Sequence, residues 1–246
     1  MQDGKKKHNM IIINPYNFKP QLKNSLISAY EFDETSGGTL FDSHGNNDGT
    51  NVNGVTINEP GVIDRAYLFN STSYTDYNTA LISGFPFSFS IWINSLDASS
   101  LRYLFASNAN VVNKYGVLIG ANSSGISVIY GNGAGVVLAN ELNHRYNISI
   151  SNNTWYHVVV TANDRTNSDT KVYVNSSEIS WTSSSGSASS TSFGAGESLL
   201  SAIWMSTRMS SWYGSIDQTS IWSKVLTPAE ILHLYNSGAG LAYSNW

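Results

Sequence analysis

Three acidic side chains near the start of the chain have types and spacing that could do acid–base chemistry. Glu31 and Asp33 stand two positions apart, and alternate residues of a β-strand point to the same face. Retaining glycoside hydrolysis needs two carboxyl groups about 5 Å apart in one cleft. Glu34 breaks the alternation and is expected on the opposite face. The segment therefore offers one pair of carboxyl groups, in the first predicted strand of the chain.

The histidines and serines form no nucleophilic constellation. His157 lies in a Val-rich run and is expected to be a packed structural residue. His44 and His144 are expected in loops, without Ser, Cys or carboxylate partners at informative spacing. The chain has no Ser-His-Asp order, no phosphate-binding glycine loop and no metalloprotease helix motif. This pattern favours a binding protein over an enzyme.

Aromatic side chains offer a different chemistry, the stacking of flat rings on sugar rings. The candidates stand near the last predicted strand or in and beside loops, and they are Trp204, Trp212, Tyr213, Tyr103 and Tyr115. Trp212 and Tyr213 are adjacent, so in an extended segment one of them must face outward. We predict carbohydrate binding by these five residues.

The composition indicates a neutral surface rich in hydroxyl and amide groups. Hydrophobic residues make up 41% of the 246 residues and charged residues 12%, so Ser, Asn, Thr and Gly must form much of the surface. The net charge of −4 provides no basic field for phosphates, and nucleic acid is therefore not an expected partner. The absence of cysteine excludes disulfides and thiolate metal sites. No run approaches the ~20 apolar residues of a membrane span, so no membrane insertion is expected.

Residues 1–24 are predicted to form an N-terminal arm, and residues 25–246 one domain. The arm contains a basic start at Lys5 to Lys7, a short apolar patch at Met10 to Ile13 and the turn-prone Asn14-Pro15. The patch is too short for the apolar region of a signal peptide, so none is expected. The arm either lies along its own domain or adds a strand to a partner protein and docks the domain there.

From Leu26 onward, short β-rich runs alternate with Gly, Asn, Asp and Ser clusters, which is typical of an all-β sandwich. In Phe87 to Ile93 the odd positions are apolar, so their side chains share one face of a sheet while Trp92 lies on the other. The predicted strands are Leu26–Phe32, Ala66–Phe69, Phe87–Asn94, Leu101–Ser107, Tyr115–Ile119, Gly125–Tyr130, Tyr146–Ile150, Trp155–Asn163, Thr170–Val174, Ala202–Met205 and Gly214–Trp222.

One short helix is predicted directly after Thr227, near the C-terminus. Thr227 can cap the helix, Pro228 fits its first position and Glu230 completes a capping box. The apolar residues of the helix fall on one stripe that packs against the sandwich: Ile231, Leu234 and Tyr235. The Ser-rich segment Thr182 to Ser192 is predicted to be a loop.

Five sequence blocks follow one another in a recognisable order. They are Gly61 to Asn70, Phe87 to Trp92, Trp155 to Thr161, Lys171 to Asn175 and Gly214 to Asn236. These blocks resemble, in order, those of the laminin G-like family in the concanavalin A-like superfamily, over about residues 25 to 240. The resemblance implies a jelly-roll sandwich of two curved antiparallel sheets, with polysaccharide or protein recognition on the concave face or the rim loops.

The resemblance also bears on catalysis and metal binding. Laminarinase-type glycoside hydrolases of the superfamily carry Glu-x-Asp-x-Glu, but here Thr35 and Ser36 stand where the last Glu belongs, so the motif is broken. Many family members hold one structural calcium ion, and the resemblance implies as candidate ligands Asp33, Asp42, Asp48 and Asp217. The segment Asp42 to Gly49 lacks the order of an EF-hand, and the alternative is a turn whose side chains bond their own backbone.

Together, these features predict a non-enzymatic binding or decoration module that recognises cell-surface glycans. The start of the chain resembles the starts of phage structural proteins, so we expect a virion-associated or otherwise extracellular protein, docked to its carrier through the arm. Several copies of such a domain, as in a homo-oligomer, would add avidity. One alternative is a purely structural virion subunit that contacts only other subunits. A second is a polysaccharide-degrading glycoside hydrolase that uses Glu31.

Overall fold

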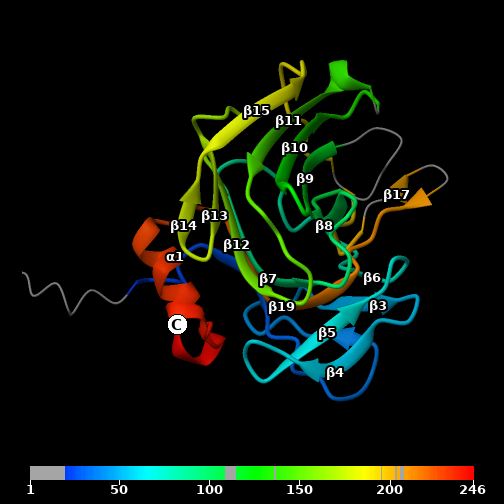
Figure 1. The fold of residues 1–246 in the computed structure, drawn as a ribbon, viewed down its shortest axis with the longest axis vertical. Helices are drawn as coiled ribbons and strands as arrows, with labels where there is room; N and C mark the ends of the chain where they lie inside the picture. The colour runs from blue at the N-terminus through cyan, green and yellow to red at the C-terminus, as the bar shows by residue number, and fades with distance from the viewer. Residues whose placement is uncertain (1–19, 109–114, 136, 195, 203, 206–207) are drawn as a thin grey trace, which may run out of the picture.

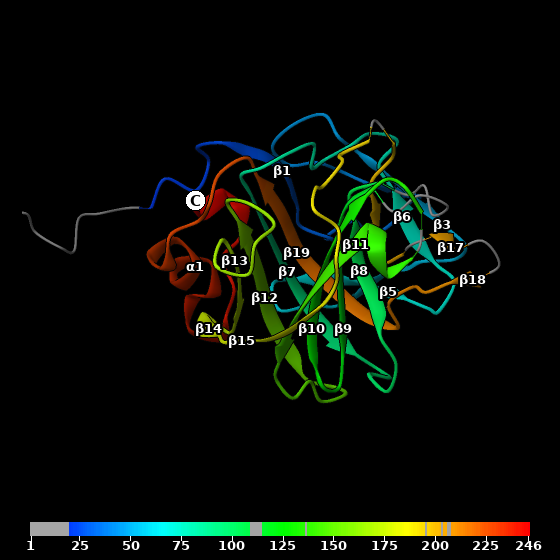
Figure 2. The same cartoon turned by 90° about the horizontal axis from the view of Figure 1, so that it is seen from above.

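The computed structural model of the chain describes residues 20–108, 115–135, 137–194, 196–202, 204–205 and 208–246. They form two antiparallel β-sheets that face each other, and an α-helix near the C-terminus lies outside one of them (Figure 1, Figure 2). The predicted fold class, an all-β jelly-roll sandwich with one short C-terminal helix, is confirmed. Residues 1–19 of the predicted arm, with the apolar patch at Met10 to Ile13, lie outside the described residues.

Sheet A has two long strands at its centre. These are β7 (Phe87–Ser95) and β19 (Gly214–Trp222), which pair with each other. The register of β19 shifts between Asp217 and Ser220, so residues 214–216 pair with β5 and residues 219–222 with β1. The other strands of the sheet are β14 (Ser177–Ile179), β13 (Thr170–Val174), β12 (Trp155–Ala162), β5 (Arg65–Phe69), β4 (Thr56–Pro60) and β1 (Leu26–Tyr30).

Sheet B is built around four antiparallel strands that follow one another in the sequence. They are β8 (Arg102–Ala106), β9 (Tyr115–Asn122), β10 (Gly125–Asn132) and β11 (Glu141–Asn147). Strand β15 (Trp181–Gly186) pairs with β11 at one edge. Beyond β8 follow the short strands β16 (Leu199–Leu200), β6 (Tyr74–Asp76), β3 (Gly49–Val52) and β2 (Thr39–Leu40). A separate hairpin joins β17 (Trp204–Met205) to β18 (Arg208–Met209).

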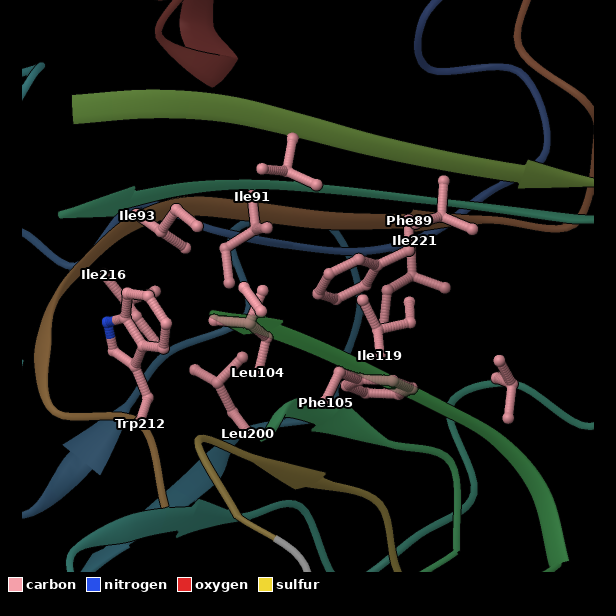
Figure 3. Close-up of a cluster of buried hydrophobic side chains, with 14 of the residues drawn as sticks. Phe89, Ile91, Ile93, Leu104, Phe105, Ile119, Leu200, Trp212, Ile216 and Ile221 are labelled. Atoms are coloured by element: carbon pink, nitrogen blue, oxygen red, sulfur yellow. The ribbon is translucent and has the colours of Figure 1, made fainter. Parts of the chain in front are cut away.

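The inner faces of both sheets supply the hydrophobic core. In β7 every second side chain from Phe87 to Ile93 points inward, as the alternation predicted, and meets side chains of sheet B such as Phe105 and Ile119 (Figure 3). Full burial of an apolar side chain of this size contributes ~1.5–3 kcal/mol. Because the chain has no cysteine, no disulfide adds to this packing.

The outer face of sheet A is covered by helix α1 (Pro228–Tyr235). Trp92 stacks on His157 of the sheet, with ring centroids 5.0 Å apart, and on Tyr235 of the helix, at 5.7 Å. Ile231 and Leu234 are buried against the same face. Trp92 therefore belongs to a strand that is covered on both sides.

The start of α1 is as predicted from the sequence. Thr227 is the N-cap, Pro228 opens the helix, and the Glu230 carboxylate accepts the backbone N–H of Thr227 at 2.8 Å, which completes the capping box. Among the described residues, the other helical segments are single 3-10 turns: η2 (Leu138–Asn140), η3 (Asn236–Gly238) and η4 (Tyr243–Asn245). In the part of the chain that the structure describes, no helix is long and apolar enough to cross a membrane.

Two strands of sheet B correct the sequence-based predictions. The Ser-rich segment predicted as a loop contributes to β15, whose backbone pairs with β11 although serine is a poor strand former. Strand β11 begins at Glu141 rather than at Tyr146, because pairing with β10 and β15 holds its mostly polar residues extended, and polar side chains such as His144 occupy buried positions.

Candidate functional site

The acidic residues after β1 lie in a loop. The expected strand alternation of Glu31 and Asp33 is wrong, because β1 ends at Tyr30 and Phe32 has a positive φ of 63°. The carboxylates instead accept hydrogen bonds from other segments: Glu31 from Ser43 Oγ (2.9 Å), and Asp33 and Glu34 from β5, through the Arg65 N–H (2.9 Å) and the Tyr67 hydroxyl (2.7 Å). These bonds tie loops together.

Asp217 is the most deeply buried of the acidic candidates. It lies at the register shift of β19, and its Oδ2 accepts the N–H groups of Val62 (2.8 Å) and Ile63 (3.0 Å). Burial, partly offset by these hydrogen bonds, raises the pKa of Asp217 to about 8. Its Oδ1 has no hydrogen-bond partner among the described residues. The side chain anchors the loop before β5 to the centre of sheet A.

The remaining two calcium candidates, Asp42 and Asp48, lie in one turn. The Asp42 carboxylate accepts the N–H groups of Ala29 (3.0 Å), His44 (3.0 Å) and Asn47 (3.2 Å), and Asp48 Oδ1 accepts that of Asp42 (2.8 Å). These donors occupy the oxygens that calcium would need, which fits the alternative of a self-bonded turn. Among the residues described, no three acidic or histidine side chains form a metal-holding group. A structural calcium ion stays a prediction, which thermal denaturation with and without calcium tests.

The two histidines of the sheets are buried. His157 Nε2 lies 2.8 Å from Ser90 Oγ, and its ring packs with Trp92 under α1. Complete burial lowers the pKa of His157 to about 3, so the ring is neutral at neutral pH. Its buried position agrees with the structural role expected of it. His144 was expected in a loop, which is wrong, because β11 begins earlier than predicted and turns this ring inward toward Tyr130.

The five aromatic candidates have different outcomes. The prediction that Trp212 binds sugar is wrong, because its side chain is fully buried between the two sheets (Figure 3). Its neighbour Tyr213 is 37% exposed, so one of the two does face outward. Tyr103 lies on the outer face of sheet B and is only 7% exposed. The side chains of Trp204 and Tyr115 lie outside the described residues.

Tyr213 belongs to a small polar cluster at the rim of sheet B. The segment before it runs beside the start of β8, where Ser211 forms a bridge with Tyr103. The Arg102 guanidinium lies over the Tyr213 ring, 5.8 Å from its centroid, and forms an ion pair with Asp97 at 3.4 Å. An aromatic ring beside charged hydrogen-bonding groups offers both stacking and polar contacts to a ligand.

A row of five residues crosses the outer face of sheet B, and we call it the cross-strand row. Tyr103 pairs with Gly120, Gly120 with Ser127, Ser127 with Arg145 and Arg145 with Ser183. The adjacent strands β8, β9, β10, β11 and β15 thus contribute one residue each. Because neighbouring strands stand ~4.8 Å apart, the row spans ~19 Å, enough for several sugar rings.

Polar and apolar side chains divide this face of sheet B. On one side, Tyr103 packs with Leu118 and Ile129 in an apolar cluster whose side chains are all buried. On the other, Arg145 donates a hydrogen bond to Ser127 Oγ at 2.8 Å. Hydroxyl and guanidinium groups beside an apolar patch are the combination from which saccharide sites are made.

Sequence reasoning misses the polar half of this face. Arg145 precedes the strand start that was predicted, and Ser183 falls in the predicted loop. The signal that could have found Arg145 is the period-two pattern of β11, in which His144 and Tyr146 face inward and Asn143 and Arg145 outward.

Solved structures with a similar fold belong to proteins of several kinds. One is domain 4 of AbnA, a GH43 extracellular arabinanase from Geobacillus stearothermophilus, solved in complex with arabinotriose. It has a TM-score of 0.59 and 22% identity, and the match covers 85% of this chain and 97% of that one. The binding domain of botulinum neurotoxin DC in complex with SialylT has a TM-score of 0.62 and 18% identity. The match covers 87% of this chain and 52% of the neurotoxin chain. Trypanosoma rangeli sialidase has a TM-score of 0.62 and 13% identity. The match covers 89% of this chain and 34% of the sialidase chain.

At these identities the similarity establishes the fold alone. The chain spans about half the length of the toxin binding domain and about a third of the sialidase. No curated protein matches the chain in sequence. A family model described as "Concanavalin A-like lectin/glucanases superfamily" matches residues 69–232, which is more than half of the chain. The chain therefore belongs to the concanavalin A-like lectin/glucanases superfamily.

Proposed function

We propose that this protein is a non-enzymatic binding module that holds saccharides on the outer face of sheet B. The observation that carries the proposal is the accessible end of the cross-strand row, where the partly buried Arg145 stands beside the exposed Ser183, with the exposed Tyr213 cluster at the rim of the same sheet. Two of the similar domains were solved with arabinotriose and with SialylT, which supports a saccharide ligand.

The position of the first described residues supports a role on a carrier. Leu22 is buried beside α1, and its carbonyl accepts a hydrogen bond from Trp222 Nε1 at 2.6 Å. This fixes the end of the arm on the sheet A side, whereas the cross-strand row lies on the outer face of the opposite sheet (Figure 2). We extend the proposal accordingly: residues 1–24 dock the domain to a virion or another extracellular carrier, and sheet B faces a cell-surface glycan.

The arrangement of the carboxylates supports binding rather than hydrolysis. Glu31 is hydrogen-bonded to Ser43, and Asp33 and Glu34 to β5, so all three carboxylates hold this loop in place, whereas a retaining hydrolase needs two carboxyl groups facing each other in one cleft. Incubation with a bound polysaccharide is therefore expected to release no reducing ends. Release that Glu31→Gln abolishes would contradict the non-enzymatic assignment.

Saccharide binding is tested with the full chain on a glycan array, followed by calorimetry with the saccharide that binds most tightly. We expect Tyr213→Ala to weaken binding about 3- to 10-fold, because an aromatic stacking contact contributes ~0.5–1.5 kcal/mol.

Leu232→Ala is the matched control, since Leu232 is 58% exposed on α1, on the sheet A side. An equal loss of affinity in this control would contradict the assignment of the ligand to sheet B. Failure to bind any carbohydrate at millimolar protein would favour the alternative, a structural subunit that contacts only other subunits.

A further inference from the structure

Arg145 carries a charge that no acidic side chain of the described residues neutralises. Its partly buried guanidinium donates to two neutral acceptors, Ser127 Oγ (2.8 Å) and Asn122 Oδ1 (2.6 Å). Burial lowers the pKa of Arg145, yet an arginine stays protonated at neutral pH. Partial burial of such a cation costs free energy, because hydration is lost and no ion pair replaces it.

Three other cations of the described chain have acidic partners, whereas Arg165, like Arg145, donates to a neutral acceptor, the carbonyl of Ala188. The ion pairs are Arg102 with Asp97, Lys171 with Glu178 and Lys224 with Glu230. Arg145 makes two hydrogen bonds that hold its guanidinium in place. They leave its charge without a counter-charge and others of its five N–H donors free. A fixed planar cation with free donors is complementary to a carboxylate.

The neighbours of Arg145 differ in what they offer to the rest of a sugar ring. Ser183 flanks it in the cross-strand row with an exposed hydroxyl group, whereas Ser127 on the other side is buried and accepts its hydrogen bond. Gly120, next in the row, is buried, and the side chains of Leu101 and Tyr103 lie beside it. Asn143 lies on the same face of β11, and its Oδ1 is buried without a hydrogen-bond partner among the residues described.

We propose that the outer face of sheet B binds an acidic saccharide and that Arg145 receives its carboxylate. This inference rests on the proposed saccharide-binding function and adds the ligand class. The carboxylate supplies the counter-charge that Arg145 lacks, and a hydroxyl group of the sugar contacts the exposed Ser183. Because the net charge of the chain is −4, the molecule as a whole does not attract anions, so selection for an acidic sugar depends on this local cation.

The test uses the full chain and pairs of saccharides that differ only in charge. The probes are oligogalacturonate, oligomannuronate, hyaluronan oligosaccharides and sialyllactose, each with its methyl ester, together with neutral polysaccharides. Calorimetry is expected to show at least one acid bound about 10-fold or more tightly than its ester, since hydrogen bonds to charged groups are the strong ones. Arg145→Gln is expected to abolish this difference, and Arg145→Lys, which keeps the charge but not the planar fork, to retain part of it.

Lys171→Gln removes one positive charge from sheet A and is the matched control, expected to leave the preference unchanged. Melting curves establish that the Arg145 variants remain folded. If a saccharide binds but every acid and its ester bind equally, or if Arg145→Gln keeps the preference, the acidic-ligand inference is overturned while saccharide binding stands. If neither acidic nor neutral saccharides bind, both the inference and the proposed function fail.

Discussion

Asp217 is a buried acid whose protonation affects the stability of the sandwich. Burial raises its pKa to about 8, against 3.8 for an exposed aspartate. Between these two pH values the folded chain keeps a proton that the unfolded chain releases. The free energy of unfolding therefore decreases as pH rises from about 4 to about 8, by up to ~1.4 kcal/mol per pH unit.

Asp217→Asn removes this titration and keeps an oxygen that can accept the N–H groups of Val62 and Ile63. We expect the free energy of unfolding of the variant to depend less on pH than that of the wild type between pH about 4 and about 8, and to exceed it at pH about 8. Urea denaturation at a series of pH values measures both quantities. An identical pH dependence in the two proteins would show that Asp217 is ionised in the fold.

Local sequence signals predict α1 well and the edge of sheet B poorly. The helix is defined by residues within one turn of one another, Thr227, Pro228 and Glu230, so its start can be read directly from the sequence. Strand β15 is different, because its serines favour no strand by themselves and the segment is extended only through pairing with β11. The same dependence on a partner strand explains why β11 was placed too late in the chain.

The capping box gives a prediction for α1. Thr227→Ala removes the side chain that accepts the Glu230 N–H and is expected to lower the free energy of unfolding by about 1 kcal/mol. Thr227→Ser keeps the hydroxyl group and is expected to lose much less. Urea denaturation compares the three proteins, and equal stability of Thr227→Ala and wild type would mean that packing of the helix alone fixes its start.

On the scale of the whole molecule, the two sheets have different outer faces. Helix α1 covers the outer face of sheet A, whereas the outer face of sheet B carries the cross-strand row (Figure 2). The order of the sequence blocks is sufficient to predict the sandwich. It is not sufficient to predict the row, because only the register of five strands brings residues as distant in sequence as Tyr103 and Ser183 into one line. The prediction that Trp212 binds sugar is wrong for a similar reason. The local sequence does not tell which residue of the adjacent pair Trp212 and Tyr213 turns inward.

The binding face is tested most directly by an NMR titration of the full chain with the saccharide that binds most tightly. We expect amide shift changes in β8 to β11 and β15, largest around Gly120, Ser127 and Arg145, and unchanged signals from α1. Shift changes confined to α1 and the strands of sheet A, or no changes at a saturating concentration of saccharide, would contradict the assignment of sheet B as the saccharide-binding face.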